Sequence, residues 1–467
     1  MTERHIVIVG GGFTGTALAI HLARNGYQGL NVTLIEPREQ PGRGVAYGST
    51  DPSHRINVPA SRMYLSASGE GDFDRWFRDS AAFRADPQAL WHDGSVYPQR
   101  AQFGTWVGEQ FSAAAGASAA RVQHIRDRAV ALKDGYVLTS YGKRFRADEV
   151  VLAISHPPPA LPSLAENIRH SPRLIANPWL KEVLAGVKPQ ERLAVMGSGL
   201  TMSDVVASLH RQGHRGSIVA FSRRGLLPRP NLTGAYAPLT LDYRQTQAAT
   251  ASGWLRRIRQ EITTAAGQQL PWQLVLDDIR RQGQTLWQQL PLKEQRRFLR
   301  LLRPWWDVHR YRIAPQVSEV LEQWQATGQL QVKAARLASL TEISDGLTLT
   351  LQPRGGSAEA LTVDKLILTT GPAHQALLQS DVLLSQLARE GTICADALGL
   401  GIQVNRHSQA LNDRGEANPH LYVAGPAARG FFGELMGLPQ VADHAESVAR
   451  QLLLDAAWPV DTERCRS

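Results

Sequence analysis

The chain has 467 residues, of which 43% are hydrophobic and 20% charged, a composition that fits a folded enzyme and excludes disordered or collagen-like chains. Its two cysteines, Cys394 and Cys465, lie far apart, which excludes a disulfide framework and the common zinc modules, so we expect no bound metal. The 51 Lys and Arg against 42 Asp and Glu give a net charge of +9, compatible with nucleic acid, an acidic membrane surface or anionic small molecules as partners.

The N-terminus runs directly into a short apolar strand and has no signal-peptide pattern. No later segment approaches the roughly 20 apolar residues that a membrane helix requires. We therefore expect a cytoplasmic protein that does not enter a membrane.

The first predicted element is a βαβ unit. It consists of a buried strand at 5–10, a helix at 16–24 and a second strand at 32–35. The turn between strand and helix carries Gly10-x-Gly12-x-x-Gly15. Glu36 stands directly after the second strand, about 20 residues beyond Gly15. This is the dinucleotide-binding fingerprint, in which the glycines allow a pyrophosphate to approach a helix N-terminus and the acid accepts hydrogen bonds from ribose. We expect FAD here, bound by Gly10, Gly12, Phe13, Thr14, Gly15 and Glu36.

The segment 148–155 is predicted to be a further strand, and it leads into a Pro-rich turn that suits a domain crossing. A second, weaker βαβ unit follows at 193–221, with Gly197, Ser198 and Gly199 in its turn and Met202 at the third glycine position. After its second strand, Ser222 stands where a ribose-binding acid is usual. Arg223 and Arg224 follow it, which favours NADPH over NADH, although NADH remains possible. The alternative interpretation is that these arginines are ordinary solvated charges.

Residues 251–330 fit neither unit and are predicted to be helical. They hold twelve Lys and Arg against seven Asp and Glu, which is over half of the net charge, and six of the 11 tryptophans. Two later strands, at 363–372 and 421–426, precede a closing helix at 441–454. The predicted fold class is α/β, with two Rossmann-like dinucleotide-binding domains and a helical insertion. We expect the FAD domain at 1–165, the NAD(P)H domain at 166–360 with its insertion at about 245–325, and a return to the FAD domain at 361–467.

Several longer motifs carry a resemblance to a known family. They are Pro41-Gly42-Arg43-Gly44-Val45-Ala46-Tyr47, His54-Arg55-Ile56-Asn57-Val58-Pro59, Tyr97-Pro98-Gln99-Arg100, Gly197-Ser198-Gly199-Leu200-Thr201-Met202-x-Asp204 and Pro304-x-Trp306-Asp307-x-His309-Arg310-x-Arg312. The chain resembles the FAD/NAD(P)-binding flavoprotein monooxygenases that include the Xanthomonas-type FAD-dependent urate hydroxylase and an aspartate N-monooxygenase. The resemblance implies that Arg43, Gly44, Asn57, Arg100 and Gly425 also lie near the flavin. One departure is Pro426 after Gly425, where a Gly-Asp pair is typical of two-domain flavoproteins.

The family resemblance also implies a reaction. NADPH reduces FAD, and O₂ then forms a C4a-hydroperoxyflavin that hydroxylates a small anionic metabolite. The leading substrate is urate, converted to 5-hydroxyisourate in purine catabolism. One alternative is N-hydroxylation of an amino acid such as aspartate. Another is a non-oxygenating flavoprotein with a partner-binding role.

Within the insertion, His309, Arg310 and Arg312 are the candidates for contact with substrate or nicotinamide, because arginines pair with anions and neighbouring aromatic rings suit a planar purine. The alternative is a helical face on which tryptophans form core and arginines are solvated. We expect no nucleic-acid partner, since two dinucleotide sites already call for a cationic surface, and a homo-oligomer is compatible with the sequence.

Overall fold

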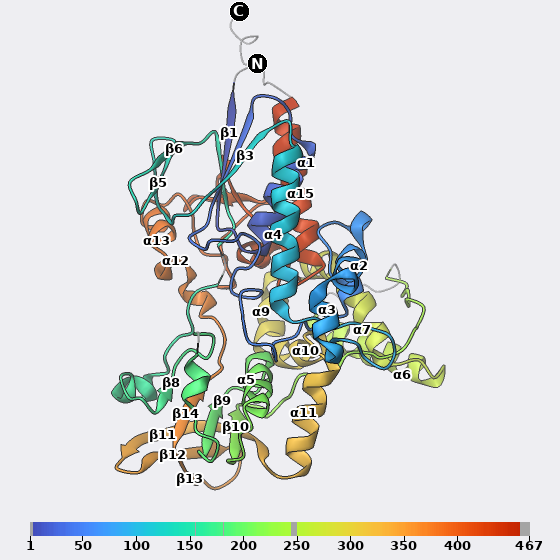
Figure 1. Ribbon diagram of the computed structural model, residues 1–467, viewed down its shortest axis with the longest axis vertical. Helices are drawn as coiled ribbons and strands as arrows, with labels where there is room; N and C mark the ends of the chain where they lie inside the picture. The colour runs from blue at the N-terminus through green and yellow to red at the C-terminus, as the bar shows by residue number, and fades with distance from the viewer. Residues whose placement is uncertain (1–2, 155, 181, 244–249, 458–467) are drawn as a thin grey trace, which may run out of the picture.

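The computed structural model describes residues 3–154, 156–180, 182–243 and 250–457. Two parallel-stranded α/β units lie at opposite ends, with β1 and α15 at the top of Figure 1 and β9 to β14 at the bottom. A group of helices, α6 to α10, lies between them at one side. The predicted α/β class, with two dinucleotide-type units and a helical insertion, is confirmed.

The first unit is built around a six-stranded sheet of order β15-β16-β7-β1-β2-β3. Its strands are β1 (Arg4–Val9), β2 (Leu30–Ile35), β3 (Arg121–Ile125), β7 (Glu149–Leu152), β15 (Gln409–Leu411) and β16 (Ala417–Val423). Residues 6–9 of β1 are almost fully buried because the strand is central and covered on both faces. The three-stranded antiparallel sheet of β4 (Ala129–Lys133), β5 (Tyr136–Thr139) and β6 (Arg144–Arg146) branches from this unit.

Three long helices cover the first sheet. They are α1 (Phe13–Asn25), α4 (Arg100–Ala117) and α15 (Gln440–Ala457), and α1 packs against both others. The shorter helices are α2 (Asp72–Asp79), α3 (Ala81–Ala85), α12 (Leu377–Ser380), α13 (Val382–Arg389) and α14 (Arg429–Phe432). Helix α1 begins at Phe13, earlier than the predicted Thr16, because the glycine loop already ends at the N-cap residue Gly12.

The second unit has a seven-stranded sheet of order β13-β12-β11-β10-β9-β14-β8. Its strands are β8 (Leu174–Ile175), β9 (Leu193–Met196), β10 (Ile218–Ser222), β11 (Leu330–Ile343), β12 (Gly346–Pro353), β13 (Glu359–Val363) and β14 (Lys365–Leu368). Helices α5 (Leu200–Arg211) and α11 (Pro315–Ala326) pack against each other in this unit. Sequence analysis did not identify β11 to β13, which form an antiparallel meander at one edge of the sheet.

The chain leaves the first sheet after β7 and returns to it only with β15. Strand β14 pairs in parallel with β9, so the boundary expected at residue 361 falls within the second sheet, inside β13. Ser155, the last residue of the strand predicted at 148–155, lies outside the described residues.

The insertion consists of α6 (Ala251–Gly267), α7 (Trp272–Arg281), α8 (Gly283–Gln289), α9 (Leu292–Leu301) and α10 (Arg303–Arg310). Pro271 and Pro291 are N-cap residues and Pro304 lies in the first turn of α10, where a missing N–H costs nothing. A small core of its own contains Val275, Leu276 and Ile279. The insertion was expected at 245–325, but residues 244–249 lie outside the described part of the chain. Among the described helices, none combines the length and the apolar character that crossing a membrane requires.

Candidate active site

A cleft of about 430 Å³ opens where β1 meets the N-terminus of α1. Its volume is in the range of ligand pockets. Seven of the residues expected to bind FAD line it, namely Gly10, Gly12, Phe13, Thr14, Glu36, Arg43 and Gly44. The fingerprint residues thus come together around one space.

The glycines of this loop have different structural roles. Gly10 has φ +101°, and a Cβ on Gly15 would stand 1.9 Å from the Gly10 carbonyl oxygen, so Gly15 lets the helix pack against the loop. A Cβ on Gly12 would meet only the Gly44 Cα, at 3.6 Å. The backbone at Gly12 therefore faces open space at a helix N-terminus, which fits a pyrophosphate.

Glu36 and Arg43 supply charge to the cleft. The buried Glu36 carboxylate accepts hydrogen bonds from the backbone N–H of Gly11 at 2.8 Å and of Arg38 at 3.0 Å. Arg43 donates to Thr105 Oγ1 at 3.1 Å, while its buried Nε has no hydrogen-bond partner among the described residues. A buried guanidinium nitrogen without a partner at a cleft wall fits a phosphate oxygen. The residues present are therefore suited to FAD.

Gly425 lies behind this loop, at φ +81°, where a Cβ would stand 2.7 Å from Thr14 Oγ1. Its N–H donates to His444 Nδ1 at 3.0 Å. Burial lowers the pKa of His444 to about 4, so the ring is neutral and can accept this bond. An imidazole of α15 thus holds the chain just before Pro426, which lines the cleft.

The second glycine turn is organised in a similar way. Gly197 has φ +121° and packs so closely on Thr369 that a Cβ would stand 2.7 Å from the Thr369 carbonyl oxygen. Gly199 is the N-cap residue of α5 and has open space beside it. Ser198 Oγ lies 2.6 Å from the Leu226 carbonyl oxygen and 2.8 Å from Ser222 Oγ, which ties the loop to the turn after β10.

Arg223 and Arg224 lie in that turn and are exposed to solvent. The Arg224 guanidinium stands 5.9 Å from the centre of the Trp305 ring of α10. The two arginines therefore remain accessible to a phosphate, as the sequence analysis expects.

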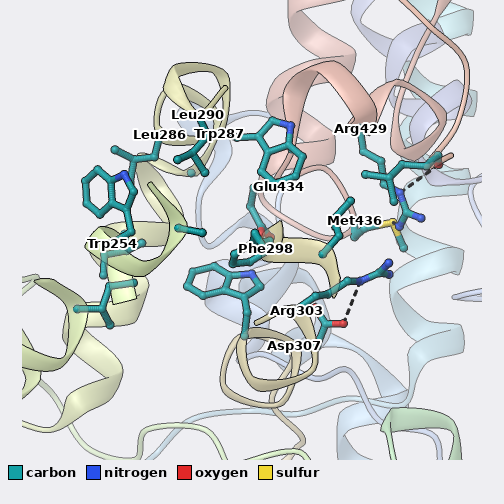
Figure 2. Close-up of a pocket in the computed structure, with 18 of the residues that line it drawn as sticks. Trp254, Leu286, Trp287, Leu290, Phe298, Arg303, Asp307, Arg429, Glu434 and Met436 are labelled. Atoms are coloured by element: carbon teal, nitrogen blue, oxygen red, sulfur yellow. Dashed lines mark hydrogen bonds and ion pairs between the residues drawn. The ribbon is translucent and has the colours of Figure 1, made fainter. Parts of the chain in front are cut away.

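A second cavity, of about 140 Å³, lies between the insertion and the segment 429–436 (Figure 2). Figure 2 shows Trp254 and Leu286 on one side of it and Arg429 and Met436 on the other. Its apolar wall includes Trp254, Ile258, Leu286, Trp287, Leu290, Phe298 and Trp306. Met436 also lines the cleft of the first unit, so the two spaces are neighbours.

Four charged side chains interrupt the apolar wall of this cavity: Arg303, Asp307, Arg429 and Glu434. Arg303 Nε pairs with Asp307 Oδ2 at 3.3 Å. Burial raises the pKa of Asp307 to about 6, although the charge of Arg303 acts in the opposite direction.

Arg429 is almost fully buried in the cavity wall. Its Nε donates to the Leu400 carbonyl at 3.2 Å, and its buried Nη2 has no hydrogen-bond partner among the described residues. Burial lowers the pKa of Arg429 to about 10, and the charge of Arg303 acts in the same direction. Arg429 therefore carries free hydrogen-bonding capacity at the wall of a largely apolar space.

The structure does not bring His309, Arg310 and Arg312 into this cavity. Arg310 is buried in an ion pair with Glu434, behind the cavity wall. Arg312 is buried in an ion pair with Asp277 at 2.8 Å, and its guanidinium stands over Trp272. His309 hydrogen-bonds the Trp305 carbonyl through Nδ1 at 2.7 Å. In this arrangement the three residues support the cavity from outside.

Sequence reasoning missed Arg303, Asp307, Arg429 and Glu434. The spacing of Arg303 and Asp307, four residues apart in a Trp-rich helix, is a signal that could have drawn attention to the first two. Asn57 and Arg100 lie between the two α/β units and not among the residues that line the cleft. In the described ranges, no group of three or more His, Cys, Asp or Glu residues could hold a metal ion.

Comparison with known proteins gives two family matches. Residues 7–157 match the family described as FAD-NAD(P)-binding, and residues 92–251 match L-lysine 6-monooxygenase/L-ornithine 5-monooxygenase. No curated protein sequence matches the chain.

Several solved structures have a similar fold over nearly the whole chain. Ornithine hydroxylase from Pseudomonas aeruginosa is 15% identical, with a TM-score of 0.62, and the match covers 98% of this chain and 100% of that one. L-lysine 6-monooxygenase from Pseudomonas syringae is 16% identical, with a TM-score of 0.60 and the same coverage. The FAD-bound cadaverine monooxygenase from Erwinia amylovora is 14% identical, with a TM-score of 0.62 over 99% of this chain and 96% of that one.

At such low identity these structures establish the fold alone, and the two family matches add the sequence relationship. The chain is therefore similar in fold to these flavin-dependent monooxygenases, and two stretches of its sequence match the FAD-NAD(P)-binding and the L-lysine 6-monooxygenase/L-ornithine 5-monooxygenase models.

Proposed function

We propose that the protein is a FAD- and NADPH-dependent monooxygenase that hydroxylates the nitrogen of a small amine bearing a carboxylate. The observation that carries this proposal is the cavity beside the FAD cleft, whose apolar wall holds both cationic and anionic groups. The buried charge of Arg429, whose Nη2 lacks a hydrogen-bond partner among the described residues, favours a ligand of opposite charge. A cavity with Arg429 and Asp307 on its wall suits a zwitterion better than a simple anion.

The size of the cavity supports a small substrate. An engineered apolar cavity of about 150 Å³ holds benzene, and this one measures about 140 Å³. The ring faces of Trp254, Trp287 and Trp306 exclude water from the alkyl part of such a ligand. The location next to the cleft, with Met436 common to both, puts the substrate within reach of a flavin.

We assign FAD to the first unit, held by the Gly10–Gly15 loop, Glu36 and Arg43, and NADPH to the second. Arg223 and Arg224 would pair with the adenosine 2′-phosphate, and NADH would lack this contact. Bound FAD would supply the transfer of two electrons from NADPH to O₂. One oxygen atom then enters the N–O bond of the product and the other leaves as water, with the two electrons of NADPH balancing the reaction.

The protein's own residues orient the substrate. Arg429 Nη2 would bind the substrate carboxylate, and the Asp307 carboxylate would accept a hydrogen bond from the amine and take the proton lost as the N–O bond forms. Because Arg303 stays paired with Asp307, the anionic form of Asp307 is available near neutral pH.

Urate is the competing substrate. Its planar, anionic ring would suit the aromatic walls and the arginines, but Asp307 and Glu434 would repel an anion in a small cavity. The family match over residues 92–251 likewise favours N-hydroxylation. For these reasons we prefer the amine.

The proposal is tested with protein loaded with FAD and mixed with NADPH and ornithine, lysine, cadaverine, aspartate or urate in separate reactions. We expect at least one amino acid to accelerate both NADPH oxidation and O₂ uptake and to yield a product one oxygen atom heavier at nitrogen, seen by mass spectrometry. Acceleration by urate alone, with 5-hydroxyisourate as product, would refute the proposal.

The raised pKa of Asp307 predicts a pH dependence. Below about pH 6 the carboxyl is protonated and can no longer accept a hydrogen bond or a proton from the amine, so kcat/KM for the amine should fall about tenfold per pH unit as the pH drops further. Above pH 6 the carboxylate is ionised, and the ionisation of Asp307 no longer changes kcat/KM. The Asp307→Asn variant should lose the break at pH 6, whereas Glu261→Gln, outside the cavity, should retain it. A wild-type profile without a break between pH 5 and 7 would contradict this role.

A further inference from the structure

A buried ion pair joins the two α/β units. Arg100, the first residue of α4 in the first unit, pairs through both terminal nitrogens with the carboxylate of Asp204 in α5 of the second, at 2.8 and 3.0 Å. The two side chains are only 9% and 6% exposed. The same guanidinium donates through Nε to the Arg55 carbonyl at 2.8 Å and through Nη2 to Asn57 Oδ1 at 3.2 Å.

The network continues into the chain segments on either side of the helical insertion. The carbonyl of Asn57 accepts a hydrogen bond from Asn231 Nδ2, which also donates to the carbonyl of Ile313 at 3.1 Å. A second contact between the units joins His54 Nε2 to Ser208 Oγ at 3.0 Å. One connected set of largely buried polar groups thus links the first unit, the second unit and the chain that follows α10. We call the second unit the coenzyme unit, because we assign NADPH to it. We refer to Arg100, Asp204, Asn57 and Asn231 as the junction.

Asp204 lies close to the end of α5 at which we expect the coenzyme to bind. Gly199 caps the N-terminus of α5, where the coenzyme pyrophosphate would bind, and Asp204 lies about one turn further along the same helix. The ion pair therefore fixes the coenzyme-binding end of α5 relative to the first unit. Buried ion pairs add little net stability compared with apolar packing, but their geometry is exacting.

Three of the motifs that carry the family resemblance end at this junction. Asn57, Arg100 and Asp204 come from three separate motifs, and the structure brings them together between the units. A role in contact with the flavin is therefore not needed to explain them.

We infer that the junction positions the nicotinamide for hydride transfer, with Arg100 and Asp204 as positioning residues that hold the coenzyme unit at one orientation to the FAD unit. This inference rests on the proposed function. Hydride transfer moves one hydrogen with its two electrons from the nicotinamide C4 to the flavin, and its rate depends steeply on alignment: a misplacement of about 1 Å can cost about 100-fold.

The test compares Asp204→Asn with the wild type in anaerobic stopped-flow reduction by NADPH. We expect the limiting reduction rate to fall by about 10- to 100-fold, while the Kd for NADP⁺ and the FAD content stay close to those of the wild type. The matched control is Asp86→Asn, which breaks a similar buried Arg–Asp pair, to Arg55 at 2.8 Å, but within the first unit. The control should keep the wild-type reduction rate.

A readout that does not need the cofactors accompanies the kinetics. Small-angle X-ray scattering of the unloaded Asp204→Asn variant should show a wider distribution of interatomic distances than Asp86→Asn, because only the former removes an ion pair that joins the two units. If Asp204→Asn does not fold, Asn231→Ala removes two neutral hydrogen bonds of the junction without burying an unpaired charge. It should slow the limiting rate by about fivefold or more, as the loss of about 1 kcal/mol of positioning would.

The experiment distinguishes failure of the proposed function from failure of this inference. A wild-type enzyme that NADPH does not reduce would refute the proposed function and this inference with it. A wild-type enzyme that NADPH reduces at the same limiting rate as Asp204→Asn and Asn231→Ala would refute the inference alone. An increase in the Kd for NADP⁺ with an unchanged limiting rate would also overturn it, since that pattern marks coenzyme binding and not alignment.

Discussion

Replacing Gly12 with alanine is expected to remove FAD from a protein that otherwise folds normally. The new methyl group meets only the Gly44 Cα, at an ordinary contact distance of 3.6 Å, so the protein accommodates it. It stands, however, where the backbone must approach the pyrophosphate. A forced close contact costs about 1–3 kcal/mol, and we expect FAD affinity to fall by about 10- to 100-fold. The measurements are the flavin absorbance of the purified protein and a titration with FAD.

Two other glycines make this result specific. Gly15→Ala would put its methyl group 1.9 Å from the Gly10 carbonyl oxygen, so it should lower the melting temperature even without FAD. Gly116→Ala, in α4 with nothing within 4 Å of the new atom, should behave as wild type. A Gly12→Ala protein that purifies with a full complement of FAD would contradict the assignment of the cleft.

Replacing Arg429 with methionine is expected to abolish efficient use of the amine substrate while leaving the reduction of FAD by NADPH unchanged. The buried Nη2 is the cationic group on the cavity wall that has no hydrogen-bond partner among the described residues, and we assign it to the substrate carboxylate. Removing one partner of a buried charged contact costs about 2–5 kcal/mol. We therefore expect kcat/KM for the amine to fall by about 100-fold or more, measured as substrate-dependent O₂ uptake.

The controls separate charge from packing. Arg429→Lys keeps the positive charge and should recover part of the lost activity. Arg296→Met, on the exposed face of α9, should have no effect. An Arg429→Met enzyme with the wild-type kcat/KM would show that the carboxylate binds elsewhere, or that the substrate has none.

The parts of the fold that could be predicted are those with a strong local pattern. The buried β1, the glycine loop and α1 follow from a few adjacent residues, and the same holds for β9 and α5. By contrast, the meander of β11 to β13 depends on where β11 lies beside β10, which no local pattern specifies. The same reasoning explains why β14 was expected with the first unit: a short buried strand gives no indication of which sheet it joins.

The candidate site likewise has one part that could be predicted from the sequence and one part that could not. The cleft residues were predictable because the fingerprint is contiguous and its geometry is nearly invariant. The cavity draws Arg303 and Asp307 from α10 and Arg429 and Glu434 from the chain more than 120 residues later, so only the folded chain shows that they meet. Several basic residues of the insertion are likewise paired locally with acidic ones, as in the pairs Arg257–Glu261 and Arg281–Asp278.

The return of the chain to the first sheet also determines the order in which the protein can be completed during synthesis. The second sheet runs from β8 to β14 and has all its strands once residue 368 has left the ribosome. The first sheet still lacks β16 and the covering helix α15 at that moment, and Gly425 and His444, which support the glycine loop, have not been made. At about 5–20 residues per second, the nascent chain spends several seconds with its second unit complete and its first open. Stable FAD binding thus has to wait until α15 has been made, and loss of that helix should leave a folded second unit attached to a first unit that cannot retain flavin.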